Sequence, residues 1–335
     1  MSSASKKLLT VLRIAVGIGL LVYVISVTGG WETILKLGDS PWILVALPIA
    51  PLLGAAVEAI RLKLLCLALR IHISFARGYQ LVAIGTLYSL VLPGGTGGDV
   101  VKLYYMAREN RGRMVESGLV LLVDRAVALF GLLLLILMLA LLNLNLVLEN
   151  TAIGWLVVAA AAAAIGIILF MQMAFSTRLR QGKLYAFATR KLPLGRFLAR
   201  VLEALYAFRE HKRAILVALA WSLCGHLVLA AMLLALGTVL MPDAPVRILP
   251  FLSLLGSLAS VIPITPGGIG VGEAATEKLY SLVGISGGAA LILSWRLSTL
   301  PLCAIGAIFS IAGVRRRSSA STADEEPTAT TVSTE

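Results

Sequence analysis

Two glycine-rich stretches interrupt an otherwise apolar chain: Leu92-Pro93-Gly94-Gly95-Thr96-Gly97-Gly98-Asp99 in the first half and Pro266-Gly267-Gly268-Ile269-Gly270-Val271-Gly272-Glu273 in the second. Each begins with a proline and a pair of glycines and reaches a carboxylate a few residues later. Proline removes a helix hydrogen bond, and glycine adopts backbone angles that other residues resist. Each stretch is therefore predicted to end one half-helix and to let another begin.

The composition around these stretches is that of an integral membrane protein. Of the 335 residues, 59% are hydrophobic and 14% are charged, with a mean hydropathy of +0.94, whereas soluble domains have roughly 25% charged residues. The expected spans, each near the ~20 apolar residues that cross a bilayer, are Leu8–Val27, a span ending near Arg61, Ser117–Leu142, Ile153–Phe175, Ala214–Met241 and Ile285–Val314. The net charge of +12 is distributed between these spans, so we expect lipid contact and no nucleic-acid partner.

The distribution of basic residues predicts the orientation in the membrane. Cytoplasmic loops have an excess of Lys and Arg. Lys6 and Lys7 precede the first span, and ten basic residues lie in 178–213, whereas Asn143–Thr151 has none. We therefore expect a multi-pass protein of the cell membrane, inner or plasma, with both termini in the cytoplasm.

The segment Gly78–Leu92 has basic residues on both sides and is too short for a comfortable crossing, because about 15 residues rise only ~22 Å as a helix. It predicts a re-entrant hairpin over 78–106 that enters from the cytoplasm, and the second motif predicts another over 248–282 that enters from outside. The expected fold class is an all-α integral membrane protein in which six spanning helices and two re-entrant broken-helix hairpins, eight hydrophobic segments in all, form an inverted repeat. The expected parts are a first repeat over 1–150, a second over 151–314 that includes a cytoplasmic amphipathic helix over 194–210, and a disordered cytoplasmic tail over 315–335.

The two halves share further features. Gly85-Thr86-Leu87-Tyr88-Ser89 precedes the first motif and Gly256-Ser257-Leu258-Ala259-Ser260 precedes the second, and each motif is followed by an arginine within a span, Arg125 and Arg296. This correspondence favours one site near the membrane midplane, built from both halves. The alternative is that the glycines only allow close helix packing.

The residues around the motifs predict a site for an anionic group. Half-helix N-termini direct N–H groups and the positive end of a dipole at such a group, and arginines within spans usually face the bundle interior. The candidate substrate-binding residues are Arg61, Pro93, Gly94, Gly95, Gly97, Gly98, Asp99, Lys102, Arg125, Pro266, Gly267, Gly268, Gly270, Glu273 and Arg296. The candidate coupling or gating residues are Asp99, Asp124 and Glu273, although Asp99 and Glu273 are equally well placed to cap their helices.

Other polar residues have more modest interpretations. Glu58 and Arg61, three residues apart, could pair with each other, and His226 is more readily a packed residue than a ligand. The three cysteines are far apart in sequence and form no metal-ligand spacing. We expect no catalytic residue, no metal site and no cofactor.

The motifs Leu92–Asp99, Asp124-Arg125, Pro263–Glu273 and Trp295-Arg296-Leu297 resemble those of the flippase-like membrane family typified by the membrane region of bacterial lysylphosphatidylglycerol synthetases. The resemblance covers roughly Leu8–Val314. It implies movement of a lipid, often with a charged or glycosylated headgroup, and related modules accompany polyprenyl-linked sugar and hopanoid pathways. We expect no soluble aminoacyl-transfer domain after Val314, and hence no synthase activity.

Three functions are consistent with these observations. The leading hypothesis is a lipid translocase that moves an anionic lipid, whether aminoacylated, glycosylated or polyprenyl-linked, between leaflets. The second is a membrane lipid-modifying transferase with Asp99 or Glu273 as general base. The third is a non-transporting membrane subunit of a lipid-glycan synthesis complex, in which a glycosyltransferase or another lipid-modifying enzyme would dock on the Leu194–Arg209 helix. A homo-oligomer is compatible with all three.

Overall fold

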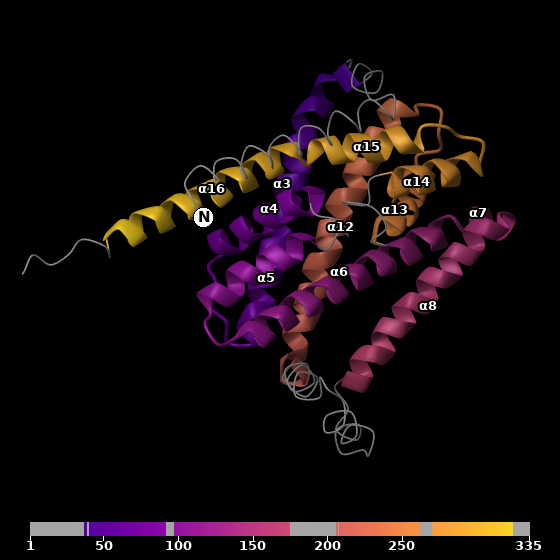
Figure 1. Ribbon diagram of the computed structural model, residues 1–335. Helices are drawn as coiled ribbons and strands as arrows, with labels where there is room; N and C mark the ends of the chain where they lie inside the picture. The colour runs from indigo at the N-terminus through magenta and orange to yellow at the C-terminus, as the bar shows by residue number, and fades with distance from the viewer. Residues whose placement is uncertain are drawn as a thin grey trace, which may run out of the picture.

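The computed structural model describes residues 37–38, 40–91, 97–174, 206, 208–261 and 270–323. Every regular element in these ranges is a helix (Figure 1). Three predicted features lie outside the described residues: the first span over 8–27, the prolines and glycine pairs that open the two motifs (Pro93, Gly94, Gly95, Pro266, Gly267 and Gly268), and most of the amphipathic helix over 194–210. The end of that helix is a single 3-10 turn, η1 (Phe208–His211).

Five segments of the described chain are long and apolar enough to cross a membrane. They are α3 (Pro41–Ala68), α6 (Met114–Leu142), α8 (Thr151–Ala174), α12 (Lys212–Leu240) with η1 before it, and α15 (Gly288–Ser298) continued by α16 (Leu300–Ala323). In Figure 1, α12 runs through the middle of the bundle and packs on α3 and α6, whereas α8 lies at the edge against α6. Helices α6, α8 and α12 begin and end within a few residues of the expected spans, whereas α3 continues seven residues past Arg61 and α16 nine residues past Val314.

The first motif lies in a helical hairpin formed by α4 (Phe75–Val91) and α5 (Gly97–Glu109). Arg77, near the start of α4, donates from Nε at 3.1 Å to Oε2 of Glu109, the last residue of α5. The two helices therefore pack antiparallel, and both ends of the hairpin lie together. This hairpin is slightly longer than the predicted range of 78–106.

The second motif lies in a hairpin of the same kind. It is formed by α13 (Ile248–Ser257), the 3-10 helix η2 (Leu258–Val261) and α14 (Val271–Ser281). Near the end of α14, the Tyr280 hydroxyl donates at 2.8 Å to the carbonyl of Leu249, the second residue of α13. The start of α13 and the end of α14 therefore lie together at the open end of this hairpin.

The two hairpins open toward opposite ends of α6. The N-terminal end of α6 follows the first hairpin directly, and Arg113 there donates to the Arg70 carbonyl at 2.8 Å, shortly before α4 begins. At the other end, Asn143 donates to the Arg247 carbonyl at 3.3 Å, just before α13. After the short helix α7 (Leu144–Glu149), Asn150 donates to the Leu282 carbonyl, just after α14. Since α6 has 29 residues, the two open ends are about 43 Å apart along its axis.

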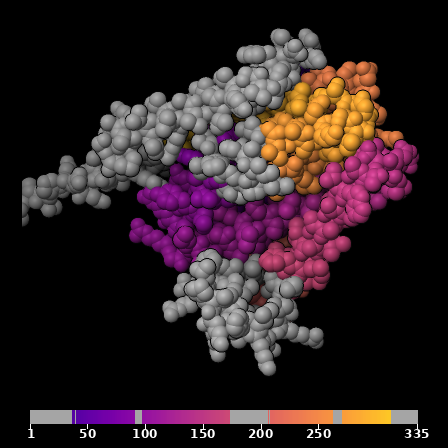
Figure 2. All heavy atoms as spheres, turned by 45° about the vertical axis from the view of Figure 1, so that its right-hand side comes forward, coloured from indigo at the N-terminus to yellow at the C-terminus, as the bar shows by residue number. Residues whose placement is uncertain are grey.

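One hydrophobic core cluster forms between α6, α12, the second hairpin and α15 (Gly288–Ser298). Its fully buried members include Ile136, Leu236, Leu249, Phe251 and Leu291. Large apolar side chains are exposed on the outside of the bundle, for example on α8, which forms an outer edge in Figure 2. An exposed apolar exterior over a packed core is expected of a bundle whose solvent is lipid.

Helix α16 continues to Ala323 and so includes the start of the tail predicted over 315–335. The physical reason is the absence of a helix breaker: no proline or glycine occurs between Arg315 and Ala323. Residues 324–335 lie outside the described part.

Candidate functional site

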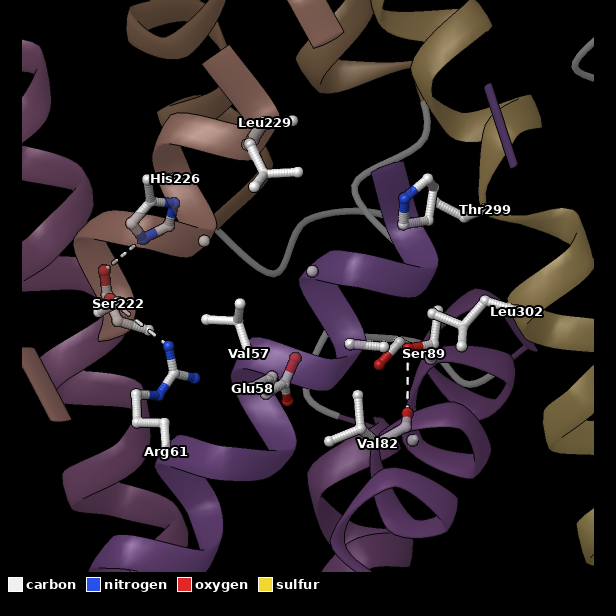
Figure 3. Close-up of a pocket in the computed structure, with 18 of the residues that line it drawn as sticks. Val57, Glu58, Arg61, Val82, Ser89, Ser222, His226, Leu229, Thr299 and Leu302 are labelled. Atoms are coloured by element: carbon white, nitrogen blue, oxygen red, sulfur yellow. Dashed lines mark hydrogen bonds between the residues drawn. The ribbon is translucent and has the colours of Figure 1, made fainter. Parts of the chain in front are cut away.

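A cavity of about 290 Å³ lies between the first hairpin, α3, α6, α12 and the α15–α16 segment. Apolar side chains such as Val57, Leu229 and Leu302 form part of its wall (Figure 3). Its polar lining consists of Glu58, Arg61, Thr86, Ser89, Lys102, Asp124, Arg125, Ser222, His226 and Thr299. The site is therefore a charged chamber within an apolar helical bundle.

Arg61 is held by a buried ion pair across the cavity floor. Its Nε lies 2.7 Å from Asp124 Oδ1 and its Nη2 lies 3.0 Å from Asp124 Oδ2, so the pair is bidentate. Nη1 donates to Ser222 Oγ at 3.4 Å, and Figure 3 shows the guanidinium turned toward that hydroxyl. The suggested pairing of Arg61 with Glu58 is thus wrong, because a bidentate partner on α6 takes the guanidinium instead.

Lys102 reaches the cavity across the first hairpin. Its Nζ lies 2.5 Å from Glu58 Oε1 and 3.6 Å from Asp99 Oδ1. The aliphatic part of Lys102 passes directly over Gly85 of α4, where any side chain would collide with it. The glycine therefore lets a lysine of α5 cross α4 and neutralise a glutamate of α3, whose carboxylate points into the cavity in Figure 3.

Arg125 and Asp99 form the third ion pair of this cluster. Arg125 donates from Nε to Asp99 Oδ2 in a short contact. Asp99 lies in the first turn of α5, so the pair joins the tip of the first hairpin to α6. The Arg125 side chain is 53% exposed, which makes this the most accessible cation among the ion pairs around the cavity.

The second hairpin has a corresponding pair. Glu273 lies in the first turn of α14, and its Oε1 is 2.5 Å from Nε of Arg296 on α15. Its other carboxylate oxygen accepts a hydrogen bond at 2.8 Å from the backbone N–H of Gly270, the residue that begins the helix with a φ of 84°. Glu273 therefore caps its helix and binds an arginine at the same time. Both side chains are largely buried, 4% and 16% exposed.

Glycine contacts at the two hairpin tips correspond as well. A side chain on Gly98, the residue before Asp99, would collide with the Ser89 hydroxyl, and one on Gly272, the residue before Glu273, would collide with the Ser260 hydroxyl. In both halves, a serine of the incoming helix thus packs on the glycine that precedes the carboxylate.

One position of this pattern differs between the halves. A side chain on Gly85 would collide with Lys102, three residues after Asp99, and one on Gly256 would collide with Thr276, three residues after Glu273. The threonine hydroxyl donates within its own helix, whereas the lysine carries a charge to the cavity. The first tip is therefore the more highly charged of the two.

The structure gathers some of the predicted residues and separates others. Arg61, Lys102, Asp124 and Arg125 line the cavity, and Gly97, Gly98 and Asp99 form the adjoining hairpin tip. Gly270, Glu273 and Arg296 form the second tip and do not line this cavity, although Trp295, the residue before Arg296, does.

Six polar residues that line the cavity were not among the predicted site residues: Glu58, Thr86, Ser89, Ser222, His226 and Thr299. His226 was expected to be packed, and its Nε2 does lie 2.9 Å from the Ala128 carbonyl, but Figure 3 places its ring at the cavity wall. The only sequence signal for these residues is that they are polar groups inside apolar spans. In the described part of the chain, no group of three or more His, Cys, Asp or Glu residues is placed to hold a metal ion.

Comparison with known proteins gives one match. The family model of the lysylphosphatidylglycerol synthase TM region matches residues 10–306, which is most of the chain. No curated protein and no solved structure matches it. The family match and the apolar helices together identify a multi-pass membrane protein with a lipid-related function. The chain belongs to the lysylphosphatidylglycerol synthase TM region family.

Proposed function

We propose that this protein is a lipid translocase and that the cavity binds the anionic headgroup of the lipid it moves. The observation that carries the proposal is the accessible guanidinium of Arg125 in a charged cavity enclosed by helices long enough to span a membrane. Ionisable residues inside a membrane domain are costly and usually mark a substrate or ion pathway. A phosphate is the natural ligand of an arginine in such a place.

The three cations around the cavity have different roles in this proposal. Arg61 is committed to Asp124 by two hydrogen bonds and is nearly buried. Arg125 has one carboxylate partner and a half-exposed side chain. A headgroup phosphate would therefore replace Asp99 at Arg125, and Lys102, 3.6 Å from Asp99, would stabilise the released carboxylate. Asp99 then acts as a gate.

An inverted repeat is the architecture that we propose for alternating access. The opening of the two hairpins toward opposite ends of α6 supports it, as does the recurrence of the carboxylate–arginine pair and of the serine–glycine contact at the two tips. Related halves of opposite orientation let one site face either leaflet in turn.

We propose that the protein lies in the inner or plasma membrane of the cell. In the proposed orientation, the open end of the first hairpin faces the cytoplasm. Basic residues crowd that end, among them Arg70, Arg77, Arg108, Arg111 and Arg113, as expected for a cytoplasmic surface. We expect a cysteine in place of Arg111 to react with a membrane-impermeant maleimide from the cytoplasmic side, and one in place of Asp243 from the other side. The parent would lack Cys224, the exposed native cysteine. Labelling of both positions from one side would rule out the inverted arrangement.

Reconstitution tests the translocase function. Purified protein in phosphatidylcholine vesicles should speed the exchange of labelled phosphatidylglycerol between leaflets, measured by reduction of the label from outside. Arg125→Gln should lower the rate by about tenfold or more, because hydrogen bonds to charged groups contribute about 1.5–3 kcal/mol.

A matched control separates this effect from a general loss of charge. Arg77 also pairs with a carboxylate, Glu109, but does so at the open end of the hairpin and does not line the cavity. Arg77→Gln should keep the wild-type rate. Equal rates for vesicles with and without wild-type protein would refute the proposal.

A further inference from the structure

The ionised side chains around the cavity are not equally accessible. The side chains of Arg61, Lys102 and Asp124 are 8%, 5% and 4% exposed, and that of Glu58 is 33% exposed. Arg125 at 53% is therefore the point at which the charged chamber reaches the surface of the bundle.

The surface next to Arg125 is formed by α5 and α6. Two contacts set the register of these antiparallel helices: Leu103 packs at Gly118, and Asp99 pairs with Arg125. Val100 on α5 and Leu122 on α6 lie between these two contacts.

Both of these side chains face outward. Val100 is 64% exposed and Leu122 is 51% exposed, and Leu122 shares a helical face with Arg125, three residues further along. Tyr104, one turn from Val100 toward the open end of the hairpin, is also exposed. An exposed cation thus adjoins an exposed apolar strip at membrane depth.

From this juxtaposition we infer a lateral portal between α5 and α6, through which a lipid reaches the cavity with its headgroup on Arg125 and its acyl chains against Val100 and Leu122. The inference rests on the proposed function and specifies the lipid's route. An acyl chain is the occupant because the strip lies on a helical pair within the membrane domain, where hydrocarbon is the solvent. Because the acyl chains and the phosphate belong to one lipid molecule, the apolar surface that contacts the chains and the cation that binds the phosphate have to be adjacent. Val100, Leu122 and Arg125 meet this requirement.

The portal has a definite side. Arg125 is eleven residues from Met114, the first residue of α6, and so lies about 17 Å along the helix from the end at which the first hairpin opens. Tyr104 lies closer to that end than Val100 does. The lipid therefore enters from the leaflet on the side of the first hairpin's open end, and its headgroup moves inward while its chains stay in the bilayer.

Photo-cross-linking tests the portal without relying on transport. A benzophenone amino acid would replace Val100 or Leu122 in the full chain, reconstituted in vesicles of phosphatidylcholine with a minority of phosphatidylglycerol. Leu141, 73% exposed near the other end of α6, is the matched control. Mass spectrometry of the adducts then compares the lipid at each position with the composition of the vesicle.

We expect adducts at positions 100 and 122 to be enriched in phosphatidylglycerol, adducts at position 141 to match the vesicle, and Arg125→Gln to abolish the enrichment. Adducts at 100 and 122 that match the vesicle, in protein that translocates lipid, would overturn the portal and leave the translocase function intact. Enrichment without translocation would overturn the function and leave the binding route intact.

A second set of variants examines the route during transport. Val100→Trp and Leu122→Trp fill the strip from the lipid side, where they disturb no buried contact, and should remove most of the translocation rate. Leu141→Trp should leave it unchanged. A wild-type rate for both portal variants would contradict the inference.

Discussion

The buried pair of Arg61 and Asp124 allows a quantitative test of how the cavity is held together. Asp124→Asn keeps the shape of the side chain but removes its charge, so the guanidinium, 8% exposed, loses the group that neutralises it. Breaking a buried ion pair in this way costs about 3–5 kcal/mol. The exposed pair of Arg77 and Glu109, with side chains 28% and 40% exposed, should lose no more than about 1 kcal/mol in Glu109→Gln.

The assay is denaturant unfolding of purified protein in mixed micelles, followed by tryptophan fluorescence. Replacing both partners by apolar residues, Arg61→Met with Asp124→Leu, leaves no unpaired charge and should recover most of the lost free energy of unfolding. The reasoning is refuted if Asp124→Asn costs no more than Glu109→Gln. It is also refuted if the double variant is as unstable as the sum of its two single variants.

Two further changes have matched controls in the chain. Gly98→Ala should prevent normal packing of the first hairpin, because the added methyl group collides with a backbone carbonyl of α4, whereas Gly54→Ala has open space around it; thermal unfolding in detergent should separate the two. Tyr280→Phe should lower the free energy of unfolding by about 1 kcal/mol, a modest loss because Ser253 also donates to the carbonyl that the Tyr280 hydroxyl contacts. Tyr104→Phe, at an exposed position, should change the same quantity by less than about 0.5 kcal/mol.

The sequence contains enough information to place the helices and the hairpin tips. Long apolar runs and glycine-rich breaks are local signals, and α5 and α14 begin within the two motifs with Asp99 and Glu273 in their first turns. Arg125 and Arg296, each predicted to follow a motif, pair with the carboxylates of these first turns. Local patterns alone therefore predict the helical class and the residues of two ion pairs, Asp99 with Arg125 and Glu273 with Arg296.

The partners of Arg61 and Lys102 could not be predicted from such local patterns. Arg61 pairs with a residue 63 positions away and Lys102 with one 44 positions away, and no periodicity within one helix encodes such a contact. The crossing of Lys102 over α4 depends on the absence of a side chain at Gly85. A small residue of this kind is indistinguishable in the sequence from the many glycines that simply allow close packing.

The long-range pairing of Arg61 also has a consequence for biogenesis. During synthesis Arg61 leaves the ribosome 63 residues before Asp124. An unpaired arginine in an inserting helix costs up to about 2.5–3.5 kcal/mol, the value at the helix centre, and Arg61 lies seven residues from the end of α3. We therefore expect the membrane-insertion machinery to retain α3 until α6 has been made, so that the arginine and the aspartate pass into the bilayer together.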